Sequence, residues 1–208
     1  MPTPEHGPGT EPSAWIMRWC ARLSPGSEVL DLACGSGRHA RALAALGCRV
    51  DAVDIDAGLA PGLSAIDGVR FRALDLEHDP WPLEGQQYDA VVVANYLYRP
   101  TLPLLAQALR DGGILVYETF AAGNERFGRP SNPDFLLVPF ELAACFAPLL
   151  HVLAFEDGVR ERPTPARVQR LCAIRSQTTR LDRLVLAEGA PVALSGEGRK
   201  GARGEGDV

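Results

Sequence analysis

The stretch Leu30-Asp-Leu-Ala-Cys-Gly-Ser-Gly-Arg-His-Ala40 joins a short apolar strand to a helix through a glycine-rich turn. Gly35 and Gly37 carry no Cβ, so the backbone can turn tightly there and approach a ligand closely. The first turn of the helix that follows leaves backbone N–H groups without partners inside the helix. This stretch therefore predicts a strand–turn–helix unit with a binding site at its turn.

Apolar runs alternate with helical patterns along the rest of the chain, and this alternation predicts an α/β fold built on a parallel sheet. We expect strands at 28–32, 49–54, 69–74, 88–94 and 114–118, helices at 13–23, 38–46, 100–110 and 139–149, and a terminal hairpin of 151–156 and 167–175. Asp157-Gly158 is the expected turn of that hairpin. The continuously apolar run at 88–94 is typical of a strand buried on both faces.

Length and composition predict one domain at 13–194, with a disordered leader at 1–12 and a disordered tail at 195–208. No apolar run is long enough to cross a bilayer and the start does not resemble a secretory signal, so we expect a cytoplasmic protein. The net charge of −5 argues against a nucleic-acid partner. Five scattered cysteines without a CxxC pair predict free thiols and no metal site.

The charge near the glycine turn separates two cofactor classes. Gly35 to Ala40 also fits the relaxed dinucleotide pattern G-x-G-x-x-A. The carboxylate of Asp31 would repel a pyrophosphate, whereas it would attract the ammonium and sulfonium of S-adenosylmethionine. The only lysine, Lys200, lies in the expected tail, so the Tyr–Lys pair of short-chain dehydrogenases is absent. We therefore favour S-adenosylmethionine over an NAD-dependent reductase.

Three acids end three successive predicted strands, namely Asp31, Asp54 and Asp75. Acids in this position can simply cap the next helix, but the carboxyl ends of parallel strands meet in the crevice where such sheets bind ligands. Asp54 follows Gly37 by seventeen residues, a spacing typical of an acid that binds ribose hydroxyls. Asp75 could reach an adenine amino group. Together they predict a negatively charged rim for a cationic nucleoside.

These residues resemble the class I methyltransferases in five stretches: Leu30 to Gly37, Val53-Asp54, Leu74-Asp75-Leu76, Tyr88 to Asn95, and Leu109 to Leu115. The resemblance implies a Rossmann-like, doubly wound seven-stranded sheet of order 3-2-1-4-5-7-6, with strand 7 antiparallel, in a three-layer α/β/α arrangement. Further stretches, Tyr117 to Phe120, Gly123 to Pro130 and Asn132 to Leu136, resemble the small bacterial methyltransferases of the tellurite-resistance type.

The resemblance implies ten cofactor-binding residues: Asp31, Ala33, Gly35, Gly37, Asp54, Ile55, Asp75, Leu76, Ala94 and Asn95. The glycine turn and Asp31 would line the methionine part, Asp54 the ribose, and Asp75 with Leu76 the adenine. Ala94 and Asn95 would lie beneath the donated methyl group.

The acceptor side is less defined by the sequence. The long stretch Thr119 to Val138 is a candidate lid whose Arg126 and Arg129 could clamp an anion, although pairing with neighbouring acids is the simpler alternative. Tyr98 is a further candidate contact, and Trp15 with Arg18 could close the other side, although core packing of Trp15 is the simpler expectation.

No convincing general base is evident. Tyr96 and Glu118 are candidates, with packing the alternative for both, and His39 is expected to be a surface histidine. The arginines of the C-terminal quarter are expected to be solvated strand faces rather than an anion site: Arg160, Arg162, Arg167, Arg170, Arg175, Arg180 and Arg183.

The sequence thus predicts methyl transfer from S-adenosylmethionine to an unidentified small molecule. The alternative is a catalytically silent S-adenosylmethionine-binding subunit that serves a partner protein.

Overall fold

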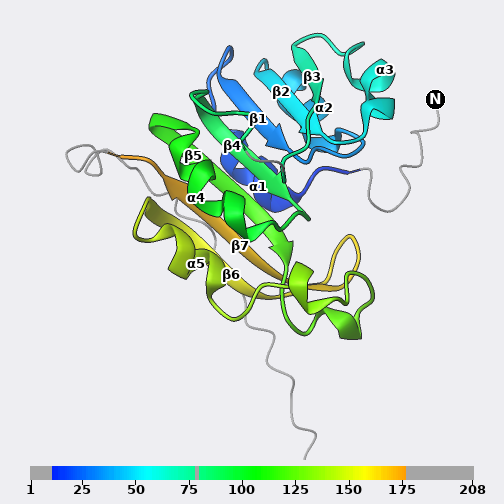
Figure 1. The fold of residues 1–208 in the computed structure, drawn as a ribbon, viewed down its shortest axis with the longest axis vertical. Helices are drawn as coiled ribbons and strands as arrows, with labels where there is room; N and C mark the ends of the chain where they lie inside the picture. Colours follow the sequence, from blue (N-terminus) through cyan, green and yellow to red (C-terminus); the bar gives the residue numbers. More distant parts are fainter. Residues whose placement is uncertain (1–10, 78–79, 177–208) are drawn as a thin grey trace, which may run out of the picture.

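The computed structural model describes residues 11–77 and 80–176, so the expected tail and all but two residues of the expected leader lie outside the described residues. Its centre is one sheet of seven strands in the order β3-β2-β1-β4-β5-β7-β6, shown in Figure 1. Their bounds are β1 Glu28–Leu32, β2 Arg49–Asp54, β3 Val69–Ala73, β4 Tyr88–Ala94, β5 Leu109–Phe120, β6 His151–Arg160 and β7 Ala166–Ile174.

Strands β1 to β5 are mutually parallel, and β7 is antiparallel to both of its neighbours, β5 and β6. The expected strand order and the antiparallel seventh strand are therefore confirmed. Parallel pairing brings the carboxyl ends of β1, β2 and β3 to one edge of the sheet, because Leu32 pairs with Val53 and Asp54 pairs with Ala73.

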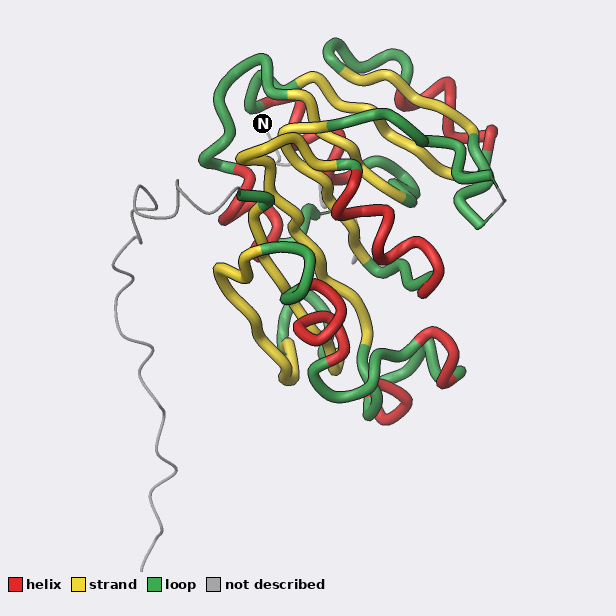
Figure 2. The backbone as a smooth tube through the Cα atoms, turned by 60° about the vertical axis from the view of Figure 1, so that its left-hand side comes forward, coloured by secondary structure: helices red, strands yellow, loops and turns green. Residues whose placement is uncertain are grey.

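Helices cover both faces of the sheet, which gives three layers (Figures 1 and 2). The α-helices are α1 Ala14–Cys20, α2 Arg38–Ala45, α3 Ala60–Leu63, α4 Leu102–Gln107 and α5 Glu141–Phe146. Short 3₁₀ helices are η1 Ala57–Leu59, η2 Arg99–Thr101, η3 Asn124–Arg126 and η4 Pro133–Phe135. Among the described residues, none of the helices has the length and apolar composition needed to cross a bilayer.

Two apolar cores result, one on each face. Side chains of α1, α2 and α3, such as Ile16 and Leu43, pack on one face of the sheet beside Val92. Side chains of α4 and α5, such as Leu105 and Phe146, pack on the other face. Alternate residues of the central strand β4 enter opposite cores, which explains its uninterrupted apolar sequence.

Strand β5 begins earlier than expected. The helical pattern over 100–110 predicts a helix up to Arg110, but α4 ends at Gln107 and Leu109 already pairs with Tyr88. Arg110 forms ion pairs with Glu28 and Asp89 at the starts of β1 and β4. These contacts with distant strands hold the segment in the sheet, and local helix propensity does not prevail there.

The other end of the chain also departs from expectation. The hairpin does not turn at Asp157-Gly158, because both residues continue β6 and the turn lies at 161–165. The carboxylate of Asp157 binds Arg167 on β7 and thus holds the two strands together. Helix α5 begins at Glu141 rather than near Pro139, since Phe140 adopts a left-handed φ of 63° and the Glu141 carboxylate accepts a bond from the Val138 N–H at 2.8 Å.

Candidate cofactor and acceptor site

The glycine turn follows β1 at the carboxyl edge of the sheet. Its backbone is held by a hydrogen bond from the Cys34 N–H to the Val53 carbonyl at 3.0 Å and by one from the Gly37 N–H to the Cys34 carbonyl at 3.0 Å. Gly37 has a left-handed φ of 75°, and a Cβ there would lie 2.0 Å from Leu63 Cδ2 on α3. Backbone conformation and close packing therefore both require glycine at this position.

Asp31 is buried at the end of β1, with 1 % of its surface exposed. Burial raises the pKa of its carboxyl to about 7, against the opposing effect of a hydrogen bond from the Ala40 backbone. Its Oδ2 is buried and has no hydrogen-bond partner among the described residues. The predicted negatively charged rim is therefore corrected at Asp31, which is a buried acid that is only partly ionised at neutral pH.

Asp54 and Asp75 lie at the neighbouring strand ends and are more accessible. The Asp54 carboxylate accepts the Gly35 N–H at 2.8 Å through one oxygen and the Asp56 N–H at 3.1 Å through the other. Asp75 accepts the Glu77 N–H at 2.9 Å. Each carboxylate oxygen has two lone pairs, so both groups retain capacity to accept bonds from a ligand.

Two apolar residues beside these acids differ in exposure. Ile55, next to Asp54, has 69 % of its surface exposed, which offers an apolar face to a ligand. Leu76 is 5 % exposed and packs in the core, so little of its side chain is left for contact with an adenine ring. Ala33 has a left-handed φ of 52°, as part of the turn.

The end of β4 completes this edge. Ala94 is partly buried, and Asn95 is exposed with a left-handed φ of 57°. The Asn95 N–H donates to the Glu118 carbonyl at 2.9 Å, which fixes its place beside β5. The Tyr96 hydroxyl donates to the Glu77 carboxylate and the Tyr98 hydroxyl donates to the Glu77 backbone carbonyl, each at 3.5 Å. Burial raises the pKa of the Tyr96 phenol.

Glu118 is fully buried on β5, but it is not free to act as a base. One carboxylate oxygen accepts Arg160 at 2.6 Å, and the other accepts Arg170 at 2.7 Å and the Ser13 hydroxyl at 3.0 Å. Both oxygens of Glu118 are occupied by ion-pair partners, so Glu118 positions these side chains. The expectation that Arg160 and Arg170 are solvated strand faces is wrong.

The prediction that His39 is a surface histidine is also wrong. It is 2 % exposed, and its Nε2 accepts the Ser13 N–H at 3.0 Å. Burial lowers its pKa to about 3, so the ring is neutral at physiological pH. Ser13 thus joins the N-terminal segment to both α2 and β5.

A cavity of about 610 Å³ lies beside these residues, and we name it the arginine cavity. Its walls come from residues 11–14, the ends of β4 and β5, the loop after β5 and the β6–β7 turn. The polar and charged residues lining it are Glu11, Ser13, Arg38, Asn95, Glu118, Asn124, Arg129, Arg160, Arg162, Thr164 and Arg170. Of the predicted acceptor-side residues, Arg129 lines this cavity, whereas Tyr98 and Arg126 do not, and Trp15 is buried in the core.

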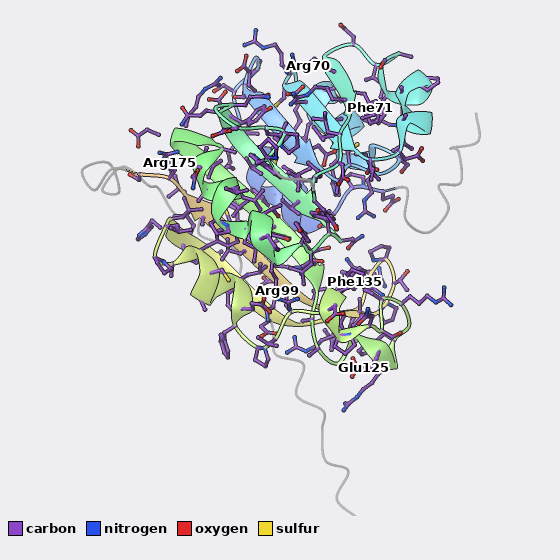
Figure 3. All side chains as sticks on the ribbon, in the orientation of Figure 1. Arg70, Phe71, Arg99, Glu125, Phe135 and Arg175 are labelled. Atoms are coloured by element: carbon purple, nitrogen blue, oxygen red, sulfur yellow. The ribbon has the colours of Figure 1, made fainter. Side chains whose placement is uncertain are left out.

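The loop after β5 is anchored rather than loose. Arg99 donates to the Asp134 and Leu136 carbonyls at 2.8 and 3.0 Å, and to Glu141 at 2.7 Å. Figure 3 shows Arg99 between the sheet and the outer part of this loop, where Phe135 and Glu125 lie. The outer part of this loop is therefore held in place by Arg99.

A second cavity of about 610 Å³ lies at the opposite edge of the sheet, where β1 to β4 begin. Its charged residues pair with one another, since Asp51 binds Arg70 at 2.5 Å and the Tyr88 hydroxyl at 2.7 Å. It is remote from the glycine turn, so we do not assign it to the site.

A family model described as a methyltransferase domain matches residues 29–113. The matched segment begins in β1, contains the glycine turn, Asp54 and Asp75, and ends in β5. This segment is therefore similar to a methyltransferase domain. S-adenosylmethionine is the cofactor of this domain.

Two methyltransferases share sequence similarity with this domain. The ribosomal protein L11 methyltransferase of Thiobacillus denitrificans is 41 % identical over 121 residues, which cover 53 % of this chain and 38 % of that protein. The protein-L-isoaspartate O-methyltransferase of Gloeobacter violaceus is 30 % identical over 105 residues, covering 48 % of this chain and 51 % of that protein. The matched part of the chain thus spans 38 % and 51 % of the length of these two relatives.

The fold of the methyltransferase domain is also that of solved structures. TehB from Haemophilus influenzae superposes with a TM-score of 0.63 at 18 % identity, covering 78 % of this chain and 61 % of that one.

The residues at the carboxyl edge of this methyltransferase domain fit S-adenosylmethionine. The Asp31 Oδ2 is buried, and residues 11–77 and 80–176 offer it no hydrogen-bond donor, whereas the cofactor's ammonium is such a donor. Exposed Ile55 beside Asp54 offers an apolar surface next to carboxylate oxygens, as a nucleoside requires.

Proposed function

We propose that this protein transfers the methyl group of S-adenosylmethionine to a small molecule bound in the arginine cavity. The observation that carries the proposal is the position of this cavity. Asn95 and Glu118, at the ends of β4 and β5, line it, and the same strand edge carries the glycine turn and Asp54. An acceptor in the cavity would therefore adjoin the methionine end of the cofactor.

In this proposal the chain's acids hold the cofactor by its polar groups. Asp31 accepts from the ammonium, Asp54 from the ribose hydroxyls and Asp75 from the adenine amino group. Ile55 packs on the nucleoside, and Leu76 supports it from the core. Ala33, Gly35, Gly37, Ala94 and Asn95 let the backbone approach closely.

When bound, S-adenosylmethionine would supply an electrophilic methyl carbon for the acceptor's lone pair, with its sulfur as the leaving group that keeps the bonding electron pair. The protein's task is mainly to orient the acceptor atom, which alone can contribute several kcal/mol to catalysis. Neither Glu118, held by two arginines, nor Tyr96, whose pKa is raised by burial, supports proton abstraction. The acceptor therefore reacts through an atom that ionises readily or loses its proton to water.

The cavity's walls support a small acceptor rather than a protein. Residues 11–14, the loop after β5 and the β6–β7 turn line it together with the strand ends. A volume of about 610 Å³ suits a molecule of drug-like size, since such sites span roughly 300–1,000 Å³.

The test has two steps. Calorimetry with S-adenosylhomocysteine measures cofactor binding, and formation of S-adenosylhomocysteine from the methyl donor is then followed with panels of thiols, amines, hydroxyl compounds and peptides. Turnover with a small molecule supports the proposal. Turnover with peptides alone contradicts the small acceptor, and tight cofactor binding without any turnover favours a silent cofactor-binding subunit.

A further inference from the structure

The arginine cavity carries an excess of positive charge. Five guanidinium groups line it, from Arg38, Arg129, Arg160, Arg162 and Arg170, against the two carboxylates of Glu11 and Glu118. Glu156 also reaches Arg170, at 3.0 Å, but does not line the cavity. Even with this third acid counted, the positive charges outnumber the negative ones by two, and a cleft of one dominant sign concentrates ligands of the opposite charge.

Arg160 lies deepest in this group and has spare donors. Its side chain is 13 % exposed and pairs with Glu118 through one terminal nitrogen at 2.6 Å. Its Nε–H is buried and has no acceptor among the described residues. Because a guanidinium has five N–H donors, Arg160 can bind a further anion without releasing Glu118.

Arg129 and Arg162 face the cavity from two different elements. Arg129 lies on the loop after β5, and Arg162 lies on the β6–β7 turn. Both are exposed, and neither forms an ion pair within the described part of the chain. Long cationic side chains converging on one cavity from separate segments can bind an anionic group bidentately.

Arg38 belongs to the other side of the site. It is the first residue of α2, next to the glycine turn, and it interacts electrostatically with Asp31 as well as Glu118. We therefore leave it out of the acceptor set.

We propose that the methyl acceptor is an organic anion, a carboxylate or a phosphate, whose charged group is bound by Arg129, Arg160 and Arg162 in the arginine cavity. This inference rests on the proposed function and specifies its substrate class. The anionic group lies at the arginine end, and the rest of the molecule extends toward Asn95, where the methyl group is received. The volume of about 610 Å³ exceeds the needs of a bare oxyanion and leaves room for a carbon skeleton.

The test measures anion binding separately from cofactor binding. Protein saturated with S-adenosylhomocysteine is titrated calorimetrically with glutarate, with glycerol phosphate, and with the uncharged analogues glutaramide and glycerol. We expect one anion or both to bind at millimolar concentration or tighter, and the uncharged analogues to bind at least tenfold more weakly. The glutarate and glycerol phosphate arms then distinguish a carboxylate from a phosphate acceptor.

Substitutions locate the site. The double variant Arg129→Gln/Arg162→Gln should lose at least tenfold in anion affinity, while its affinity for S-adenosylhomocysteine stays within twofold of wild type. The matched control is Arg126→Gln, which removes one charge from the same loop but outside the cavity lining. It should keep its anion affinity within twofold.

Each failure has a separate meaning. Equal binding of charged and uncharged probes, no anion binding at all, or equal losses in the control and the double variant overturn the inference while cofactor binding persists. If the wild-type protein does not bind S-adenosylhomocysteine, the proposed function itself is overturned.

Discussion

Replacing Asp31 by asparagine should stabilise the protein in a pH-dependent way. Burial raises the pKa of this carboxyl from an ordinary value of 3.8 to about 7, so the folded protein holds the proton more tightly than the unfolded chain does. The contribution of Asp31 to the free energy of unfolding is therefore highest below pH 3.8. Between pH 3.8 and pH 7 it falls by about 1.4 kcal/mol per pH unit, and above pH 7 it is constant. Over the whole window the loss amounts to about 4 kcal/mol.

Asparagine cannot ionise, so the Asp31→Asn variant lacks this penalty. Its new amide N–H₂ takes the place of an oxygen that has no partner among the described residues, which costs about 1–3 kcal/mol at every pH. The net gain at pH 8 is then about 1–3 kcal/mol. The difference in stability between variant and wild type should move by about 4 kcal/mol in favour of the variant between pH 4 and pH 8.

Urea unfolding of both proteins across this pH range measures the difference directly, since all other titrating groups cancel. Asp51→Asn is the matched control. Asp51 is also buried, and burial raises its pKa, but hydrogen bonds from Arg70 and Tyr88 together with the charges of Arg72 and Arg70 outweigh burial and hold the pKa below the ordinary value. That variant should therefore be less stable than wild type by a nearly constant amount between pH 4 and pH 8, because Asp51 is ionised in both the folded and the unfolded chain over this range. A pH-independent difference for Asp31→Asn would refute the reasoning.

Three further predictions concern the cofactor edge. If the ammonium binds ionised Asp31, affinity for S-adenosylhomocysteine should fall about tenfold per pH unit below pH 7, and calorimetry should find no such slope in Asp31→Asn. Asp54→Ala should weaken that affinity by about 1–3 kcal/mol. Asp56→Ala, which removes the hydrogen bond from the Gly58 N–H, should leave the affinity nearly unchanged. Equal effects of the two variants would contradict the ribose assignment. Gly37→Ala should destabilise the protein by at least about 1 kcal/mol more than Gly85→Ala in thermal unfolding, because both glycines have φ of 75° but a Cβ meets another side chain only at the former.

The sheet was predictable because its central strands carry their own signals. The apolar run of β4 and the glycine turn after β1 need only local sequence to be read, and both were found at their predicted positions. The terminal hairpin was also predicted, but its turn was placed wrongly, since Asp157-Gly158 is a good turn sequence. Its residues pair instead with Gln169 and Val168 of β7, a contact that no local pattern encodes.

The site was predictable only on its cofactor side. Acids at strand ends follow from strand order, but the burial of Asp31, which makes its charge depend on pH, requires the packed structure. On the acceptor side, Arg160 and Arg170 lie 42 and 52 residues from Glu118, so their convergence could not be inferred from spacing. His39 likewise lies buried and accepts a hydrogen bond from the Ser13 N–H, which lies 26 residues earlier in the chain.

A crystal structure of the protein grown with S-adenosylhomocysteine tests the central assignment most directly. The account predicts density for the nucleoside along the ends of β1 to β3, with both ribose hydroxyls within hydrogen-bond distance of the Asp54 carboxylate and the amino group beside Asp31. A nucleoside bound elsewhere, or ribose hydroxyls that face away from Asp54, would contradict it.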